Sequence, residues 1–279
     1  KRRTSMNTAS SPRLATSSWS LHRALGMTYP DAPGKPNSGS AETYGSGSIT
    51  LLDVPARLAA MGISGFEICH FHIPSRDQKY IDELRQALKS AGVELLTLLI
   101  DDGDITHPEH GQRDLEWISG WIETAGQLGA KRARVVAGKS QLSAETLERS
   151  KAGLTQLVEV GKANGVRIIT ENWFDLLSTP DAVQQVMDAV DIGLLADFGN
   201  WKGSSKYDDL AVILPRAESC HAKCSFIAEG QPDSEDYLRC LDLAREANYS
   251  GPYSLIYDGV GKDEWAGITI EKELVQPHI

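Results

Sequence analysis

The sequence has few cysteines and lacks the best-known motifs for phosphate and dinucleotide binding. Its 4 cysteines in 279 residues do not form the dense pattern of a disulfide framework, so we expect reduced thiols and a cytoplasmic protein. There is no phosphate-binding loop, no Gly-x-Ser-x-Gly nucleophile elbow and no Gly-x-Gly-x-x-Gly after an expected strand. These absences disfavour nucleotide and serine-hydrolase chemistry and favour an unphosphorylated substrate.

Long apolar runs and an excess of positive charge are also missing. No run of about 18 apolar residues exists, so no transmembrane helix is expected. The basic residues 1–3 are not followed by an apolar stretch of secretory-signal length, and residues 1–12 have the polar, Ser-rich composition of a disordered arm. The formal net charge of −10 disfavours binding to nucleic acid and to anionic membranes.

From residue 13 onward, short apolar runs of strand type alternate with longer segments of helical periodicity. The expected strands are residues 14–18, 65–69, 94–100, 132–137, 167–171, 193–197, 219–223 and 253–258. The expected helices are residues 51–61, 79–91, 114–128, 144–164, 180–190, 207–214 and 235–248. Eight strands separated by crossovers are parallel, and they close most naturally into a single (β/α)₈ TIM barrel over residues 13–279. An open doubly wound sheet is the alternative, but it usually has fewer strands.

One long segment interrupts this alternation. Residues 26–48 are rich in Gly, Pro and Ser and are too long for a tight turn. Such a loop is usually functional or disordered. Because it follows the first strand, we expect it over the mouth of the barrel, where it could act as a lid.

Charged and imidazole side chains gather where the expected strands end. These residues are Glu67, His70, His72, Asp101, Asp102, Glu171, Asp197, His221, Lys223 and Asp258. In a barrel, functional groups collect at the C-terminal ends of the strands. Such groups are costly to bury singly, so together they predict a polar pocket.

The strongest trio comes from the fifth, sixth and seventh strands. Glu171 ends the first of these, Asp197 the second, and His221 the third. Two carboxylates and one imidazole suit Mn²⁺, Mg²⁺ or Zn²⁺. Such an ion polarises sugar oxygens and acidifies a carbon-bound proton.

The motifs around this trio carry a family resemblance. Glu171-Asn172, Asp197-Phe-Gly-Asn200 and His221-Ala-Lys223, in this order, resemble the xylose isomerase-like sugar phosphate isomerase/epimerase family. The likeness extends over residues 14–273. It implies a TIM barrel in which Glu171, Asp197 and His221 bind the metal and Lys223 contacts the substrate.

The eighth strand departs from the family pattern. The family has a second metal-binding Glu there, which also takes part in proton transfer, but Ile256 stands at that position and Asp258 matches a later acidic residue. Three outcomes stay open. The metal binds through three ligands, with Glu171, His70 or His72 as the base; Asp258 or a loop residue supplies the fourth ligand; or the metal site is lost.

Further residues are candidate substrate contacts, each with a plain structural alternative. His70 and His72 follow the second strand, and strand periodicity predicts that both imidazoles lie on one face, as polar loop residues or as substrate or catalytic groups. Glu67 is the candidate for a structural ion pair. Alternation aims Cys220 and Cys224 away from the pocket, which disfavours a cysteine metal site. The remaining candidate contacts, some of which could simply fill the barrel top, are Trp19, His22, Asn172, Trp173, Asn200, Trp201 and Asp258.

We therefore predict a metal-dependent isomerase, epimerase or elimination lyase acting on a sugar, cyclitol or keto-sugar by proton abstraction next to a carbonyl. The alternative is a metal-free barrel that serves as a sugar-binding or accessory subunit, and Ile256 is the residue that favours it. A nuclease of the apurinic-site endonuclease branch is a third possibility, which 7 histidines and a charge of −10 disfavour. The expected partner is a small carbohydrate-like molecule; homo-oligomers are common in the resembling family.

Overall fold

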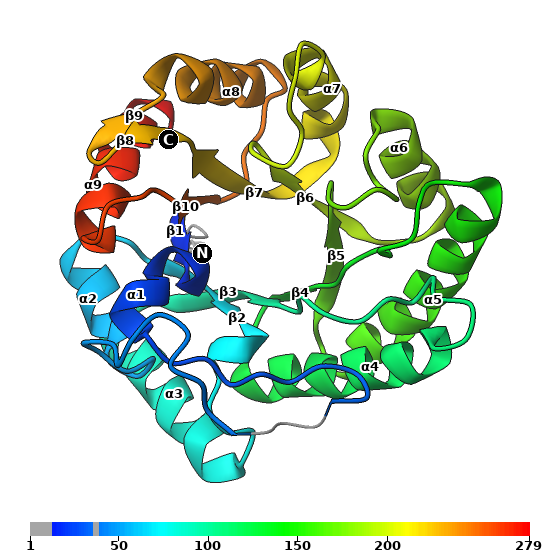
Figure 1. Ribbon diagram of the computed structural model, residues 1–279, viewed down its shortest axis with the longest axis horizontal. Helices are drawn as coiled ribbons and strands as arrows, with labels where there is room; N and C mark the ends of the chain where they lie inside the picture. Colours follow the sequence, from blue (N-terminus) through cyan, green and yellow to red (C-terminus); the bar gives the residue numbers. More distant parts are fainter. Residues whose placement is uncertain (1–12, 36–38) are drawn as a thin grey trace, which may run out of the picture.

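The computed structural model describes residues 13–35 and 39–279; the predicted N-terminal arm, residues 1–12, lies outside this range. Eight parallel strands close into a barrel in the order β1-β10-β7-β6-β5-β4-β3-β2. Figure 1 looks into this ring and shows the helices as an outer shell around it. The predicted TIM barrel is confirmed. The barrel strands are β1 Leu14–Ser17, β2 Gly65–Cys69, β3 Glu94–Leu99, β4 Arg132–Arg134, β5 Arg167–Glu171, β6 Gly193–Asp197, β7 Ala217–Cys224 and β10 Tyr253–Tyr257.

The helices of the outer shell alternate with the strands in sequence. They are α2 Val54–Ala60, α3 Gln78–Ala91, α4 Gly111–Leu128, α5 Ala144–Ala163, α6 Pro180–Ala189, α7 Lys206–Ile213, α8 Ser234–Glu246 and α9 Glu264–Val275. Gly92 and Gly129 end α3 and α4 in the left-handed conformation, with φ of +66° and +78°. Only glycine adopts this conformation without a steric cost, which is why these residues mark helix ends in the sequence. None of the described helices is long and apolar enough to cross a membrane.

Several shorter elements lie outside the barrel strands and the helices of the outer shell. They are α1 His22–Leu25, the 3₁₀ helices η1 Ser18–Leu21, η2 His70–His72, η3 Leu214–Arg216 and η4 Gln276–His278, and the hairpin strands β8 Phe226–Ala228 and β9 Gln231–Pro232. Within the described parts of residues 26–48, the only β-pairing is in isolated bridges, such as Thr28 with Ala41. The β8–β9 hairpin follows β7 and was not predicted.

The sequence prediction missed α9 and made β4 too long. The buried residues of α9 have helical spacing (264, 267, 268, 271 and 275), but Gly267 and the β-branched residues 268–270 weaken the helical signal. Strand β4 ends at Arg134, while residues 135–137 stay buried without being part of the strand. Burial explains their apolar character without strand pairing.

Two layers of apolar side chains fill the molecule. The larger lies between the strands and the helices and includes Cys220 and Cys224, which therefore point outward from the barrel as predicted. The smaller lies inside the barrel and consists of Cys69, Leu99, Ile169 and Leu195, with Trp19 and Phe71 against it. Polar residues at the C-terminal strand ends thus stand next to a dry apolar layer, which strengthens electrostatic interactions between them.

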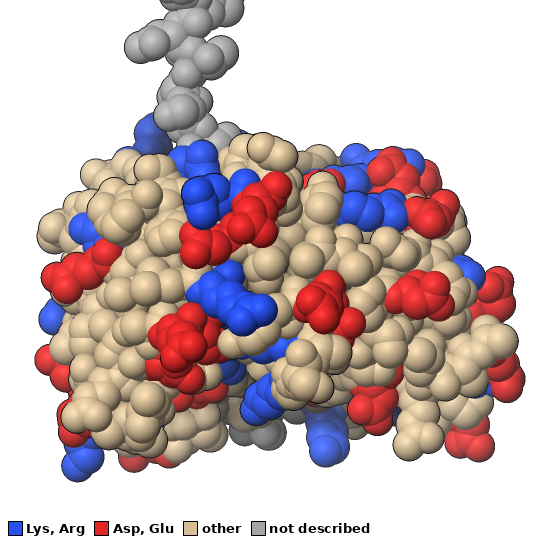
Figure 2. All heavy atoms as spheres, turned by 90° about the horizontal axis from the view of Figure 1, so that it is seen from above, with Lys and Arg blue, Asp and Glu red and all other residues tan. Residues whose placement is uncertain are grey.

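Charge is mixed over the side of the barrel that Figure 2 presents. Lys and Arg side chains alternate there with Asp and Glu, and no broad area of one sign is visible on this face. A broad basic face is what binding to a phosphate backbone would need. The acidic net charge is therefore not offset by a basic region on this side.

Candidate metal centre

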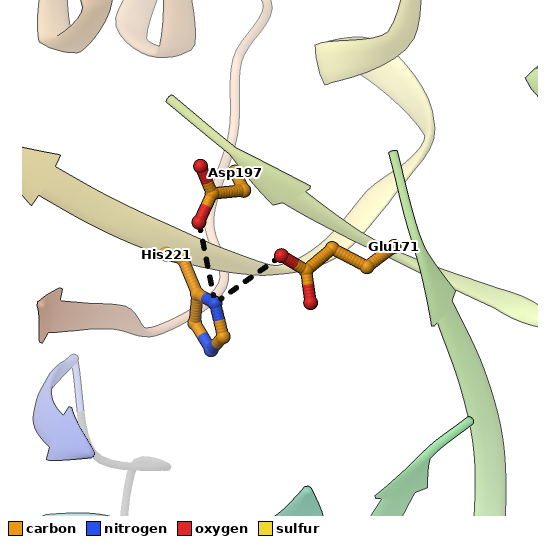
Figure 3. Close-up of side chains that lie close together, drawn as sticks. All are labelled: Glu171, Asp197 and His221. Atoms are coloured by element: carbon orange, nitrogen blue, oxygen red, sulfur yellow. Dashed lines mark ion pairs between the residues drawn. The ribbon is translucent and has the colours of Figure 1, made fainter. Parts of the chain in front are cut away.

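Glu171, Asp197 and His221 converge at the C-terminal end of the barrel. They stand near the ends of the adjacent parallel strands β5, β6 and β7, so the sheet brings them to one edge. One ligand atom from each lies within 4.8 Å of the others, and all three side chains are buried. Nδ1 of His221 is 3.7 Å from Oε1 of Glu171 and 3.5 Å from Oδ2 of Asp197, as the dashed lines in Figure 3 mark.

A fourth buried residue holds the opposite side of the imidazole. Oε2 of Glu67, on β2, is 2.9 Å from Nε2 of His221, and Oε1 of Glu67 accepts a hydrogen bond of 2.7 Å from Thr97. Burial alone would raise the pKa of Glu67, but His221 and Thr97 outweigh it and lower that pKa below its ordinary value. Glu67 thus forms the buried ion pair predicted for it, and its partner is a candidate metal ligand.

This geometry fits a divalent cation. With the Nε2 proton directed at Glu67, the Nδ1 lone pair faces two carboxylates, an arrangement that needs a positive charge between them. Burial would lower the pKa of His221, yet the carboxylates of Glu67 and Glu171 outweigh it and raise that pKa well above its ordinary value. A proton or a metal ion supplies the missing charge. In metal sites, a histidine ligand usually donates its other ring N–H to a carboxylate or carbonyl, which fixes the orientation of the ring.

Asp197 is held by the backbone that follows it. Its Oδ1 accepts hydrogen bonds from the amides of Gly199 (2.6 Å) and Asn200 (2.8 Å), which leaves Oδ2 for the candidate metal position. A Cβ at Gly199 would lie 2.8 Å from Cδ of Lys223, so glycine is needed for this close approach. Asn172 bonds both backbone polar groups of Asp197 and does not line the pocket. The Asp-x-Gly-Asn motif thus fixes the orientation of the Asp197 carboxylate.

Glu171 is held at both oxygens. Asn200 donates to Oε1 at 2.7 Å, and Nε of Arg134 lies 3.1 Å from Oε2. Arg134 also pairs with Asp101, and its guanidinium carbon is 5.1 Å from the ring centroid of Trp173. Arg134 was not among the predicted site residues. Its signal in the sequence was an arginine inside the expected strand 132–137, between the apolar residues Ala133 and Val135.

A small pocket opens beside these residues, with a volume of about 60 Å³. It is lined by Ser17, Trp19, Cys69, Leu99, Asp101, Arg134, Glu171, Trp173, Asp197, Asn200, His221, Lys223 and Ile256. Ile256 pairs with Lys223 in the sheet register and presents an apolar wall where the resembling family has its second Glu. Nζ of Lys223 lies 2.9 Å from Asp258, which is half exposed and does not line the pocket.

The two histidines after β2 diverge. The prediction that both share one face is wrong, because residues 70–72 form a 3₁₀ turn rather than a strand. His70 lies against Trp117 and Trp121, with ring centroids 5.3 Å away in each case. His72 contacts the hydroxyl of Ser18 at 2.9 Å, and burial lowers its pKa to about 3. Neither imidazole lines the pocket.

Some of the other predicted substrate contacts line the pocket, and others do not. Trp19, Trp173 and Asn200 line the pocket. His22 lies behind Trp19, with ring centroids 4.6 Å apart, and burial lowers its pKa to about 4. Trp201 donates its indole N–H to the carbonyl of Leu177 and packs in the outer apolar layer.

The fold and this site define a TIM barrel with a buried carboxylate and imidazole cluster suited to a metal ion. The chain belongs to the Xylose isomerase-like TIM barrel family, whose family model matches residues 55–270. No curated protein matches the sequence.

Several solved structures share the fold at low identity. An L-ribulose 3-epimerase is 16% identical with a TM-score of 0.69, over 96% of this chain and 94% of that one. A Xylose isomerase-like TIM barrel protein from Mycobacterium smegmatis, in complex with magnesium, is 16% identical with a TM-score of 0.68, over 98% of both chains. The probable 3-DHS dehydratase AsbF from Bacillus anthracis is 13% identical with a TM-score of 0.68, over 95% of this chain and 98% of that one.

Proposed function

We propose that this protein is a divalent-metal-dependent enzyme that removes a proton next to a carbonyl in a sugar, cyclitol or keto-sugar. The observation that carries the proposal is the buried cluster of Glu171, Asp197 and His221, with Glu67 fixing the imidazole from behind. Mn²⁺, Mg²⁺ and Zn²⁺ all suit two carboxylates and one imidazole. When bound, such an ion polarises the substrate oxygens next to the reacting carbon.

The residues of the chain have separate roles in this proposal. Glu171, Asp197 and His221 hold the metal, and Glu171, which lines the pocket, also accepts the proton. Lys223 lines the pocket, and burial would lower its pKa, but Asp197 and Asp258 outweigh this and raise it. The ammonium therefore stays charged and stabilises a developing enolate oxygen. Trp19, Trp173 and Asn200 contact the substrate.

The apolar wall at Ile256 favours some reactions over others. An epimerase that removes a proton on one face and returns one on the other needs two groups, and the second carboxylate is missing from β10. Elimination needs one well-placed base and a Lewis acid. We therefore favour elimination or isomerisation over two-carboxylate epimerisation. Among the structural neighbours, both an epimerase and a probable dehydratase occur, which supports this range of chemistry.

Metal content tests the proposal. We would measure it by elemental analysis of the wild type, Glu171→Ala, His221→Ala and Ile256→Glu, with His72→Ala as the control for loss of a buried histidine outside the cluster. The proposal expects near-stoichiometric metal in the wild type and His72→Ala, and loss in Glu171→Ala and His221→Ala. The proposal is overturned if the wild type contains no metal and only the Ile256→Glu variant binds it. That result would support a sugar-binding or accessory barrel.

Proton abstraction has its own readout. In D₂O, a panel of unphosphorylated keto-sugars and keto-cyclitols is incubated with the metal-loaded protein, and mass spectrometry follows deuterium uptake at the carbon next to the carbonyl. We expect uptake that depends on metal and disappears in Glu171→Gln. Metal binding without exchange for any member of the panel would retain the metal site and remove the proposed reaction.

A further inference from the structure

Arg134 is the most constrained cation at the C-terminal end of the barrel. Its side chain is 3% exposed and lies between two carboxylates, Asp101 and Glu171. It also bonds the carbonyl of Ile100 at 3.2 Å. Burial would lower the pKa of Arg134, but Asp101 and Glu171 outweigh it and raise that pKa further. The guanidinium is thus permanently charged, hydrogen-bonded to a backbone carbonyl and to Asp101, and ion-paired with Glu171.

A continuous polar chain leads from Arg134 to the loop after β1. The amide of Asp101 donates to Nδ1 of His70 at 3.2 Å, so the proton of the neutral imidazole sits on Nε2. Nε2 of His70 is 3.2 Å from the carbonyl of Asp31, to which it donates. In the sequence, His70 is 31 positions from Asp101 and 39 positions from Asp31. In the structure, the contacts of these residues connect Asp31 to Arg134 and, through it, to Glu171.

The far end of this chain is firmly anchored. The carboxylate of Asp31 accepts hydrogen bonds from the indoles of Trp121 (3.0 Å) and Trp117 (3.3 Å), both on α4. The amide of Tyr29 donates to the carbonyl of Phe71 at 2.7 Å. The segment 29–31 is therefore fixed to the end of β2 and to α4 at once, and its position determines where His70 can donate.

We propose that Arg134 is the positioning residue for Glu171, and that Asp31 and His70, acting through Asp101, hold Arg134 in place. This inference rests on the proposed function in that Glu171 is taken as a metal ligand. The guanidinium reaches both carboxylates at once through separate nitrogens, Nη2 toward Asp101 and Nε toward Glu171, which the single ammonium of a lysine cannot do. Oε2 of Glu171 is thereby kept at the guanidinium, while Oε1 stays with Asn200 on the side of the candidate metal position.

The same strand supplies a matched control. Arg132 stands two residues before Arg134 on β4, at the other end of the barrel, and its Nε lies 3.9 Å from Glu218. His72 likewise matches His70, since both are buried in one 3₁₀ turn but only His70 contacts Asp101. Each variant on the proposed chain can thus be compared with a neighbour of the same residue type.

Cobalt(II) is the probe for the test, because its visible absorption reports ligand geometry independently of turnover. Titrations would be run on the wild type, Arg134→Met, Arg134→Lys and His70→Phe, with Arg132→Met and His72→Phe as controls. Loss of an outer partner of a metal ligand typically weakens metal binding 10–100-fold. We expect about that loss, with an altered spectrum, for Arg134→Met, incomplete recovery in Arg134→Lys, and a smaller change of the same kind in His70→Phe. The two controls should bind as the wild type does.

The outcomes separate this inference from the proposed function. Wild-type cobalt binding that is unchanged in folded Arg134→Met and His70→Phe overturns the positioning role and leaves the proposed function standing. If Arg134→Met does not fold, Arg134→Lys and His70→Phe decide. If the wild type binds no cobalt, the proposed function fails. The positioning role is then tested by metal-free crystal structures of Arg134→Lys and His70→Phe. A displaced Glu171 side chain supports the inference, and an unchanged one overturns it.

Discussion

The two ends of the barrel use charge differently. At the N-terminal end, Arg167 pairs with Glu218 (2.9 Å) and Asp191 (2.8 Å), and these side chains remain about one-third exposed or more. At the C-terminal end, Glu67 and His221 form a pair that is at most 6% exposed. Exposed pairs contribute little to stability, whereas breaking a buried pair leaves a charge without compensation. The first end should tolerate change, and the second is where the chain accepts the energetic cost of burying a charged cluster.

Buried polar atoms without hydrogen-bond partners occur toward both ends of the barrel. Among the described residues, buried atoms with no hydrogen-bond partner include the indole nitrogen of Trp19, both ring nitrogens of His22, Nε2 of His72 and Oδ2 of Asp101. These atoms follow the C-terminal ends of β1, β2 or β3, whereas Nε of Arg132 and Oγ of Ser219 lie toward the N-terminal ends of β4 and β7. Buried polar groups without partners are rare and need a reason.

The largest effect should come from Glu67→Leu. The change leaves His221 buried without its partner, and we expect a loss of about 3–5 kcal/mol in the free energy of unfolding. The matched change at the other end, Glu218→Leu, should cost about 1 kcal/mol or less. Urea unfolding at pH 7 measures both. Equal costs would mean that the two ends do not differ as described.

A buried carboxyl on α9 extends the comparison to the outer layer. Glu271 is 0% exposed, and burial raises its pKa well above the ordinary value of 4.5, although the amide of Cys224 and the charge of Lys223 offset part of this. Because the folded-state pKa is raised, the stability contribution is fully present below pH 4.5 and is lost as pH rises toward the folded pKa.

Glu271→Gln should therefore gain stability over the wild type as pH rises. The difference should be near zero at pH 4 and grow by up to about 1.4 kcal/mol per pH unit above 4.5 until the folded pKa is reached. Urea unfolding at several pH values measures it. The exposed Glu273 on the same helix is the control, and Glu273→Gln should show no such trend. A pH-independent difference for Glu271→Gln would contradict the raised pKa.

Ile256→Glu tests whether a carboxylate at position 256 completes the set of metal ligands. Without metal, the new carboxylate is buried on the β10 wall, and we expect a loss of about 1–3 kcal/mol in unfolding free energy. Added Mn²⁺ should restore stability, because a ligand that binds only the folded state raises its stability with concentration. Thermal melts with and without MnCl₂ measure this. A melting temperature that does not respond to Mn²⁺ would show that position 256 does not complete a metal site.

The smallest effect is expected for Arg167→Met. Its partners Glu218 and Asp191 stay near solvent, so the loss should be about 1 kcal/mol or less and should shrink further in 1 M NaCl. Urea unfolding at low and high salt provides the measurement. A large, salt-insensitive loss would show that this network is effectively buried and would remove the contrast between the two ends.

Local patterns predicted most of the architecture. The bounds of β2, β5 and β6 follow directly from short apolar runs, and Gly92 and Gly129 mark helix ends by their conformational freedom. The secondary-structure prediction failed where residue spacing and residue composition indicate different elements. In α9, β-branched residues stand at helical spacing, and after β4 a buried irregular segment has the composition of a strand.

The site was predicted in part for the same reason. Glu171, Asp197 and His221 end successive parallel strands, so their meeting follows from topology. His70 and His72 were misplaced relative to each other because a 3₁₀ turn replaces the strand periodicity on which the prediction relied. A change of local geometry over three residues was enough to send the two imidazoles in different directions.

The sequence by itself determined the order of strands and helices, the closed barrel and the cluster of Glu171, Asp197 and His221, because each follows from local periodicity and from the rule that parallel strand ends share one edge. Only the tertiary structure decided that Glu67 would meet His221 from 154 residues away and that Arg134 would lie between Asp101 and Glu171. The Glu67–His221 contact crosses the barrel interior, and the contacts of Arg134 join the ends of three neighbouring strands. They depend on the stagger between strands and on the packing of side chains, which no local pattern in the sequence encodes.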